Sequence, residues 1–391
     1  MKTANNIVQA SNQCVKCGLC STVCPTYQLT HDEAESARGR IALMQGLVQG
    51  QLSLTTTAQT HLESCLSCGL CETVCPAQVD YSDLIDSTKL WLRENNRPAS
   101  RLSQALCWLI QKPWRLRVLH HLLYRLQQLG LLRWLKKMPA TLQRTPSYLP
   151  ALLPPKTWQT HYPSSHTHHK RHVGLFQGCL QSMLDQATLT DSILLLNRLG
   201  FDVHIPKKSV CCGALALHSG HPEKITPCHP AFNALSLDAV ITTTPGCSAV
   251  MKPADFHAPL IDIHPFLAAA DWSSVRFRTS SLTLALHVPC TQNRQFSATM
   301  IQQLLQKIPG ISVVPFESGK TCCGAAGTYM LDHPEMADGL CAKLLEKLPE
   351  KTDILLSSNL GCLLHLQRFL QTNKSKIKVQ HPISLLAQYV I

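Results

Sequence analysis

The sequence predicts a multi-domain chain in which an N-terminal helical module is followed by two α/β domains, each built on a parallel sheet. Three observations lead to this fold class. A run of four cysteines near the N-terminus recurs 51 residues later, and the segment between the copies has helical apolar spacing. A wider cysteine pattern occurs twice in the C-terminal half, at an offset of 111 residues. Four short apolar runs in that half each end at a cysteine, and helical stretches follow the first and third runs. This order of strand, loop and helix is typical of an open parallel sheet.

The composition limits the kind of protein. The chain has 391 residues, of which 45% are hydrophobic and 15% charged, so it can bury cores in two or three domains. Its 19 cysteines are an odd number, which argues against a closed disulfide framework. The N-terminal sequence MKTANNIVQA has no apolar stretch of signal-peptide length, so we expect a cytoplasmic protein whose reduced thiols bind metal.

The N-terminal module is predicted from two copies of the motif C-x2-C-x2-C-x3-C-P. The copies consist of Cys14, Cys17, Cys20 and Cys24, followed by Pro25, and of Cys65, Cys68, Cys71 and Cys75, followed by Pro76. A [4Fe–4S] cluster needs four thiolates, and in two-cluster ferredoxins the fourth cysteine of each run serves the other cluster. We therefore predict a helical two-cluster ferredoxin module at residues 1–97. Cys75 completes the site of Cys14, Cys17 and Cys20, and Cys24 completes that of Cys65, Cys68 and Cys71.

Structural zinc is the alternative for these runs. Zinc ribbons pair two C-x2-C units across a loop, whereas each run here already holds four cysteines within eleven residues. Iron–sulfur ligation is therefore favoured. Arg38 and Arg40 lie between the runs, where their positive charge could tune a cluster potential or simply occupy an exposed helix face.

Helices are predicted around the runs and in the segment that follows them. Residues 34–50 and 81–93 place apolar side chains near one face. Residues 106–138 mix Leu and Trp with Arg and Lys at helical spacing, and Pro113 should divide them into two helices. The later part of this linker region, which we place at 98–171, is predicted to be irregular.

The two C-terminal domains are predicted from the pattern C-x31-C-C-G followed by one more cysteine. Its members are Cys179, Cys211, Cys212 and Cys247 in the first copy and Cys290, Cys322, Cys323 and Cys362 in the second. The apolar runs VGLFQGC, AVITTTPGC, LTLALHVPC and DILLSSNLGC end at cysteines of this set, and helical stretches follow the first and third. We predict α/β domains at residues 172–275 and 281–391, with the cysteines at the carboxyl ends of parallel strands.

The net charge of +12 arises from one segment of the chain. No acidic residue lies between Glu94 and Asp185, whereas 13 Lys or Arg residues do. No run of 18 or more apolar residues predicts a membrane-spanning helix. We expect the basic amphipathic helices to contact a membrane surface; the alternative is a helical hairpin that docks on a partner or packs within the chain. The residues concerned are Lys112, Arg115, Arg117, Arg125, Arg133, Lys136 and Lys137, with Trp91, Trp108, Trp114 and Trp134.

The cysteine patterns resemble those of known families. The doubled pattern resembles the cysteine-rich CCG domain of heterodisulfide reductase-like proteins. Together with residues 14–80, it resembles the iron–sulfur subunit of glycolate oxidase in motif order over nearly the whole chain. The resemblance implies a subunit that takes electrons from a flavoprotein oxidising a 2-hydroxy acid, glycolate to glyoxylate, and passes them to a membrane quinone.

The resemblance also implies where cofactors and partners lie. The glycines at 213, 324 and 327 do not form a dinucleotide fingerprint, so FAD is expected on partner dehydrogenase subunits of a hetero-oligomer. We expect the chain to lie on the cytoplasmic face of the inner membrane, to be inactive alone and to bind no nucleic acid. The equivalent subunit of anaerobic glycerol-3-phosphate dehydrogenase or of lactate oxidation is the alternative.

The CCG cysteines depart from the fullest form of their pattern, which ends in C-x-x-C. Val250 and His365 stand at the final positions, so each domain offers four cysteines rather than five. Four suffice for an additional iron–sulfur cluster or metal, and a packed pair of buried cysteines is the alternative. The missing cysteines argue against a heterodisulfide reductase-like thiol–disulfide reductase, which is a further functional alternative. A metal-binding module without redox chemistry is disfavoured by the doubled ferredoxin run.

Overall fold

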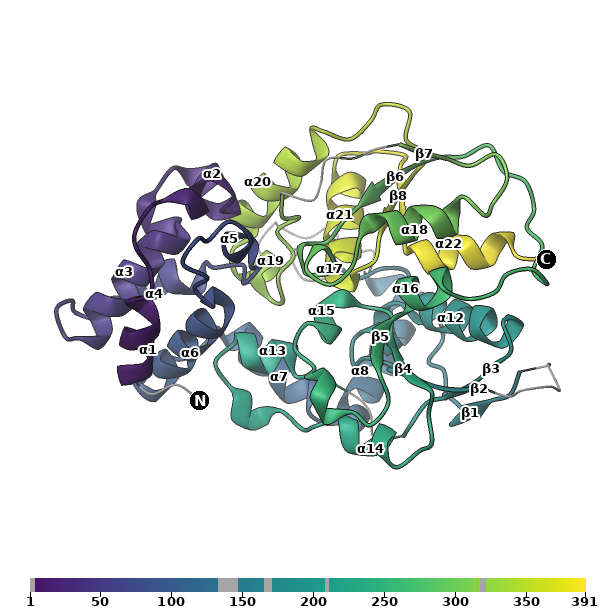
Figure 1. The fold of residues 1–391 in the computed structure, drawn as a ribbon, viewed down its shortest axis with the longest axis horizontal. Coiled ribbons are helices and arrows are strands. Elements are labelled where there is room, and N and C mark those ends of the chain that lie inside the picture. The colour runs from purple at the N-terminus through teal and green to yellow at the C-terminus, as the bar shows by residue number, and fades with distance from the viewer. Residues whose placement is uncertain (1–3, 133–146, 165–170, 208–210, 315, 317–320) are drawn as a thin grey trace. The chain divides into compact units, whose positions relative to one another are not determined.

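The structure is a computed structural model that describes residues 4–132, 147–164, 171–207, 211–314, 316 and 321–391. The chain divides into two compact units, each assembled from separate segments (Figure 1). Unit 1 comprises Met1–Cys107, Ala214–Ile225 and Glu317–Lys347, and unit 2 comprises Trp108–Gly213, Thr226–Phe316 and Leu348–Ile391. Both units therefore use parts of the C-terminal half.

Unit 1 is helical in the residues that are described. Its α-helices are α1 (Ala4–Ser11), α2 (Pro25–Thr30), α3 (Ala37–Val48), α4 (Thr56–Glu63), α5 (Leu70–Thr73), α6 (Tyr81–Glu94), α13 (Ala214–His218), α19 (Tyr329–Asp332) and α20 (Pro334–Leu345). Short 3-10 helices are η1 (Leu19–Thr22), η2 (Glu33–Glu35) and η3 (Pro222–Lys224). Helix α7 (Arg101–Ile110) begins in unit 1 and ends in unit 2.

The core of unit 1 forms where α3 packs against α1 and where α1 packs against α6. Ser36 and Asp80 cap α3 and α6, each side chain accepting a backbone N–H three residues further on. Met44 of α3 and Leu84 of α6 are fully buried in this core. Both helices confirm the apolar patterns predicted from the sequence.

Helix α20 brings a distant segment into unit 1 by packing on α2. A Cβ added to Gly339 of α20 would lie 3.1 Å from Leu29 Cδ2 of α2, so the Leu29 side chain packs directly on the backbone of α20 at this glycine. Lys343 Nζ donates to Gln28 O at 3.0 Å beside this contact. Residues following ligand candidate Cys24 are thus held by a helix more than 300 residues later in the chain.

Unit 2 contains all the β-strands among the described residues. Its strands are β1 (His161–Tyr162), β2 (Arg171–Leu175), β3 (Phe201–His204), β4 (Ala239–Thr242), β5 (Leu260–Asp262), β6 (Thr283–His287), β7 (Ser312–Val314), β8 (Ile354–Ser357) and β9 (Lys378–Gln380). Its helices are α8 (Pro113–Gln128), α11 (Gln181–Leu184), α12 (Gln186–Arg198), α14 (His229–Asn233), α15 (Pro245–Ser248), η4 (Pro253–Asp255), α16 (Ile263–Ala268), α17 (Cys290–Asn293), α18 (Ala298–Leu305), α21 (Leu360–Thr372) and α22 (Pro382–Tyr389).

The two sheets of unit 2 share one topology. The first has the order β1-β3-β2-β4-β5 and is parallel except that β1 pairs antiparallel with β3. The second has the order β7-β6-β8-β9 and is parallel throughout. Apart from β1, each repeat therefore places its strands in the same order, which confirms the predicted α/β fold. The chain leaves the first strand of each repeat towards one edge of its sheet and the third strand towards the other edge. Ligands of open α/β sheets commonly bind at such a switch in direction.

A shared apolar core holds the two repeats together. Strand β4 is buried throughout, as expected for a central strand with both faces covered. Leu175, Ile241 and Leu386 contribute to one cluster in which side chains of both repeats meet. Helix α12 of the first repeat packs along α22 of the second, and Figure 1 shows these helices side by side.

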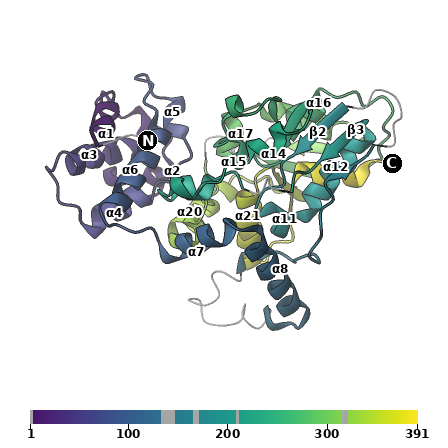
Figure 2. The ribbon, with the colours of Figure 1, turned by 90° about the horizontal axis from the view of Figure 1, so that it is seen from below.

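Helix α8 lies at the edge of unit 2 (Figure 2). Pro113 separates it from α7, as predicted. Leu116 and His120 are buried on one side of α8, and His120 Nε2 lies 3.0 Å from Leu153 O. Within the described ranges, no helix is both long and apolar enough to cross a membrane. The basic residues and tryptophan predicted at Arg133, Trp134, Lys136 and Lys137 lie outside the described residues.

Candidate metal centres

The two N-terminal cysteine runs form the same loop. The residue before the second cysteine is left-handed in both, with φ of 55° at Lys16 and 49° at Ser67. The following glycines, Gly18 and Gly69, are also left-handed, with φ of 83° and 68°. Non-glycine residues adopt this conformation rarely and often at binding sites. In the second loop Ser67 N donates to Cys65 Sγ at 3.4 Å, so the backbone offers a donor to a ligand sulfur.

A pocket in unit 1 is lined by cysteines of both runs. It contains Cys14, Cys17 and Cys20 of the first run together with Cys71 and Cys75 of the second. The structure thus brings Cys75 to the three cysteines with which the sequence groups it. Burial raises the pKa of Cys20, with the thiols of Cys24 and Cys14 adding to the effect.

The other predicted set, Cys24 with Cys65, Cys68 and Cys71, is more deeply placed. Cys24 is 7% exposed and Cys71 is 9% exposed. Burial raises the pKa of Cys68, to which Cys322 also contributes, and burial raises the pKa of Cys71, to which Cys68 contributes. Cys24 acts electrostatically on both groups, so the structure brings this cysteine close to the second run.

The residues present in unit 1 fit two iron–sulfur clusters. Each predicted set offers four thiols, and the 19 cysteines, all of which are described, form no disulfide. Crowded, buried thiols resist losing their protons together, because each thiolate repels the next. A bound iron–sulfur cluster supplies the positive charge that stabilises four thiolates and brings one-electron chemistry to the site.

Arg38 and Arg40 of α3 differ in environment. Arg38 has 35% of its side chain exposed and pairs with Glu33 at 2.7 Å. The Arg40 side chain is 1% exposed and pairs with buried Glu35. The exposed-face interpretation is therefore wrong for Arg40, because the period of an amphipathic helix alone does not reveal which polar side chain finds buried partners.

The four cysteines of the first CCG pattern form one group in unit 2. Cys179 follows β2, Cys211 and Cys212 follow β3, and Cys247 lies in α15, which follows β4, so all four lie beyond the carboxyl ends of parallel strands. Hydrogen bonds from Cys179 and Cys212 lower the pKa of Cys211 to about 3. The same bonds raise the pKa values of Cys179 and Cys212, and a bond to Cys247 adds to the rise at Cys212. Four neighbouring cysteine side chains are an arrangement suited to a metal ion.

Glutamines two residues after the first cysteine tie the loops of each repeat together. Gln181 Oε1 accepts from Thr243 Oγ1 at 2.8 Å. Gln292 Oε1 accepts from Ser358 Oγ at 2.6 Å. Each bond joins the loop after the first strand of a repeat to the loop after the third, next to the cysteines. These glutamines were not among the residues predicted from the sequence, although both repeats read C-x-Q.

The second CCG pattern is distributed over both units. Cys290 and Cys362 belong to unit 2, in the first turns of α17 and α21. Cys322 and Cys323 belong to unit 1, where they are 4% and 3% exposed. Cys322 contributes to the raised pKa of Cys68, a cysteine of the second ferredoxin run in the same unit.

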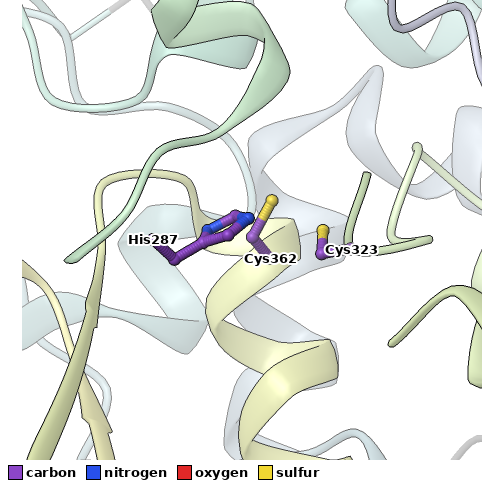
Figure 3. Close-up of side chains that lie close together, drawn as sticks. All are labelled: His287, Cys323 and Cys362. Carbon is purple, nitrogen blue, oxygen red and sulfur yellow. The ribbon is translucent and has the colours of Figure 1, made fainter. Parts of the chain in front are cut away.

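A histidine that the sequence analysis did not single out lies beside Cys362 in unit 2. One ring nitrogen of His287, at the end of β6, lies within 4.8 Å of Cys362 Sγ (Figure 3). His287 Nδ1 also lies 3.0 Å from Ser357 Oγ. When the two patterns are aligned on their cysteines, Phe176 stands opposite His287, and this difference is the signal that could have identified it.

Two protein families match the chain. The 4Fe-4S dicluster domain matches residues 10–79, and the cysteine-rich CCG domain matches residues 173–252 and 284–367. The glycolate oxidase iron-sulfur subunit of Escherichia coli (strain K12) is 30% identical to the chain, over 98% of this chain and 95% of that protein. The chain belongs to the family of glycolate oxidase iron–sulfur subunits. Members of this family are iron–sulfur electron-transfer subunits of oxidoreductase complexes.

Two further proteins are also similar to the chain. The probable glycolate oxidase iron-sulfur subunit of Bacillus subtilis (strain 168) is 28% identical over 96% of this chain and 93% of that protein. Lactate utilization protein A of Shouchella clausii (strain KSM-K16) is 23% identical over 55% of this chain and 98% of that protein. The family and fold class predicted from the cysteine patterns are confirmed, whereas the individual ligands stay predictions.

Proposed function

We propose that this chain is the iron–sulfur subunit of a glycolate dehydrogenase and passes electrons from a partner flavoprotein towards a membrane quinone. The observation that supports this most strongly is that one compact unit brings cysteines of both runs together. In the proposal, Cys14, Cys17, Cys20 and Cys75 hold one [4Fe–4S] cluster, and Cys24, Cys65, Cys68 and Cys71 hold the other. Crossed ligands keep the two clusters near one another, as a relay requires.

The hydroxy acid is oxidised on another chain in this proposal. Oxidation of glycolate removes two electrons, which a flavin accepts, whereas each cluster takes one electron at a time. This sequence has no dinucleotide fingerprint, so the partner subunits carry the FAD. Lactate is the second candidate substrate, because a relative named for lactate utilisation matches more than half of the chain.

Complementation tests the proposed function. The chain is produced in an Escherichia coli strain that lacks its own glycolate oxidase iron–sulfur subunit, and glycolate-dependent dye reduction by membranes is measured. We expect activity with the wild-type chain, none with Cys65→Ala, and less with lactate than with glycolate. The purified chain alone should reduce no dye. Turnover by the isolated chain, or a cluster-loaded chain that assembles with the host subunits without restoring activity, would contradict the proposal.

The first CCG group is proposed to bind a further metal or iron–sulfur cluster. Its support is the hydrogen-bonded group of Cys179, Cys211, Cys212 and Cys247, in which the neighbouring thiols lower the pKa of Cys211. Iron, sulfide and zinc are counted in the anaerobically purified chain. The wild-type chain is expected to contain more metal than two [4Fe–4S] clusters hold, and the Cys211→Ala variant should lose only this excess. An unchanged metal content in the variant would favour a packed cysteine group.

Helix α8 is proposed to contact an anionic membrane surface. Trp114, Val118 and Leu122 lie four residues apart and are 60%, 59% and 54% exposed, so one apolar stripe faces solvent. Arg117 and Arg125 are exposed on the same helix, and no acidic residue occurs in this part of the chain. An exposed apolar stripe with basic flanks suits the interface of an anionic bilayer, where each basic residue is worth about 1 kcal/mol.

Vesicle co-sedimentation separates this membrane contact from docking on a protein. The double variant Arg117→Glu/Arg125→Glu should lose binding to vesicles that contain anionic lipid, and Lys374→Glu/Lys376→Glu, with the same change of charge at exposed sites of unit 2, should keep it. Binding should weaken as salt rises. If wild-type protein does not sediment, or both variants behave alike, α8 would be assigned to contact with the flavoprotein.

A further inference from the structure

Helix α3 directs one arginine towards each predicted cluster site. Arg38 Nη1 donates to Lys16 O at 3.3 Å, in the loop of the first run. A Cβ added to Gly18 of that loop would lie 2.6 Å from Arg38 Nη1, so the guanidinium covers the loop closely. Arg40 stands two residues further on, and side chains at that spacing point to opposite sides of a helix.

Arg40 is buried beside the second site with a complete set of hydrogen bonds. Its donors reach His61 O at 2.7 Å from Nε, Glu35 O at 2.6 Å and Thr26 Oγ1 at 3.1 Å from Nη1, and Ser64 Oγ at 2.9 Å and Glu35 Oε2 from Nη2. Thr26 Oγ1 lies 3.4 Å from Cys24 Sγ, and Ser64 directly precedes Cys65. A single hydroxyl therefore separates the guanidinium from one predicted ligand.

Arg40 interacts electrostatically with two of the predicted ligands, Cys65 and Cys24. Burial alone would lower the pKa of Arg40, but Cys65, Tyr81, Glu35 and Cys24 outweigh burial and raise it. Conversely, Arg38 pairs with Glu33 where both side chains are substantially exposed. Solvent screens the exposed pair, whereas the buried charge acts through a medium of low dielectric constant. The two arginines should therefore affect their clusters to very different degrees.

We propose that Arg40 is a positioning residue that raises the reduction potential of the cluster held by Cys24, Cys65, Cys68 and Cys71. The inference rests on the ligand sets of the proposed function. One-electron reduction adds negative charge to a cluster and its thiolates, so a fixed guanidinium stabilises the reduced form. The carboxylate of Glu35 opposes this effect.

Redox titration followed by EPR tests the assignment on the anaerobically purified full-length chain. The Cys75→Ala variant lacks one ligand of the cluster predicted at Cys14, Cys17 and Cys20. Its remaining EPR signal therefore identifies the other cluster, held by Cys24, Cys65, Cys68 and Cys71, which we call the buried cluster. In that background Arg40→Gln should lower the potential and Glu35→Gln should raise it. Arg40→Lys, which keeps the charge, should shift it less than Arg40→Gln. Arg38→Gln serves as the matched control and should leave this potential unchanged.

Shifts of the reduction potential in opposite directions in Arg40→Gln and Glu35→Gln distinguish an effect of charge from an effect of packing. Damage to the shared hydrogen-bond network would move both variants in the same direction, so shifts of the same sign, or none, would overturn the inference. If Arg40→Gln holds no cluster, Glu35→Gln decides: a raised potential supports the inference and any other result overturns it. Absence of the buried cluster from the Cys75→Ala chain would overturn the ligand sets as well, whereas unshifted potentials in loaded variants overturn the role of Arg40 alone.

Discussion

Acidification should destabilise unit 2 through His381, the residue that caps α22. His381 is 2% exposed, and its Nε2 donates to Thr243 O at 3.0 Å and Ser358 O at 3.2 Å. Its Nδ1 accepts from Ile383 N at 3.2 Å. These bonds require neutral imidazole, because a proton on Nδ1 would remove the acceptor. Burial, with a contribution from His264, lowers the pKa of His381 to about 3.

The sign of the effect follows from the direction of this shift. In the unfolded chain His381 binds a proton near its ordinary pKa of about 6.5, whereas in the folded chain it does so only near pH 3. Its contribution to the free energy of unfolding is therefore fully present above about pH 6.5 and falls as the pH is lowered towards 3. At about pH 5 the unfolded state has gained a factor of roughly 30 from protonation, which costs about 2 kcal/mol of unfolding free energy.

Urea unfolding at about pH 8 and about pH 5, followed by tryptophan fluorescence, measures this loss. Trp272 is a suitable reporter because it lies in the same core cluster as Ile383. The variant His381→Asn keeps an acceptor for the helix cap and has nothing to titrate. Its free energy of unfolding should fall by about 2 kcal/mol less than that of the wild type between the two pH values. Equal losses would show that His381 is not a source of acid sensitivity.

Three further outcomes are expected. Cys24→Ala should remove the cluster of the second run and Cys75→Ala that of the first, each halving iron and sulfide in the N-terminal module; EPR loss of the opposite cluster would refute crossed ligation. Ile241→Ala, at a fully buried site in β4, should cost about 2–5 kcal/mol in urea unfolding, and a cost under about 1 would contradict the packing. Gly324→Ala should destabilise unit 1 by about 1–3 kcal/mol in the same assay, because Gly324 has φ of 81° and a Cβ would lie 2.6 Å from Ala337 O; unchanged stability would refute the close approach.

Local and periodic features of the fold could be predicted from the sequence. The repeated ferredoxin motif predicted that the two cysteine runs would come together, and one pocket is lined by Cys71 and Cys75 of the second run beside cysteines of the first. Which cysteines share a cluster stays a prediction. Pro113 predicted a helix boundary because proline cannot donate the backbone hydrogen bond that a continuing helix needs. These features depend on neighbouring residues or on repeated spacing, both of which are visible in one sequence.

Features that depend on long-range packing could not be predicted. Arg40 lies two residues from Arg38 on the same helix, and the sequence does not show that Thr26 and Ser64 will pack beside it and accept its hydrogen bonds. His287 lies near Cys362 because β6 and β8 are adjacent strands, which follows from sheet order and not from sequence spacing. Nor does the cysteine repeat indicate that Cys322 shares a unit with the ferredoxin runs.

The packing of α20 on α2 affects how the protein is made. A ribosome synthesises α2 early and α20 only after some three hundred further residues, and domains generally begin to fold as they emerge. Until then Leu29 lacks the helix that covers it, and the backbone after Cys24 lacks the restraint from Lys343. A nascent or truncated ferredoxin segment therefore displays apolar surface next to reactive thiols. We therefore expect iron and sulfide to be incorporated at Cys24 after the whole chain has been synthesised. An N-terminal fragment should be prone to aggregation and oxidation.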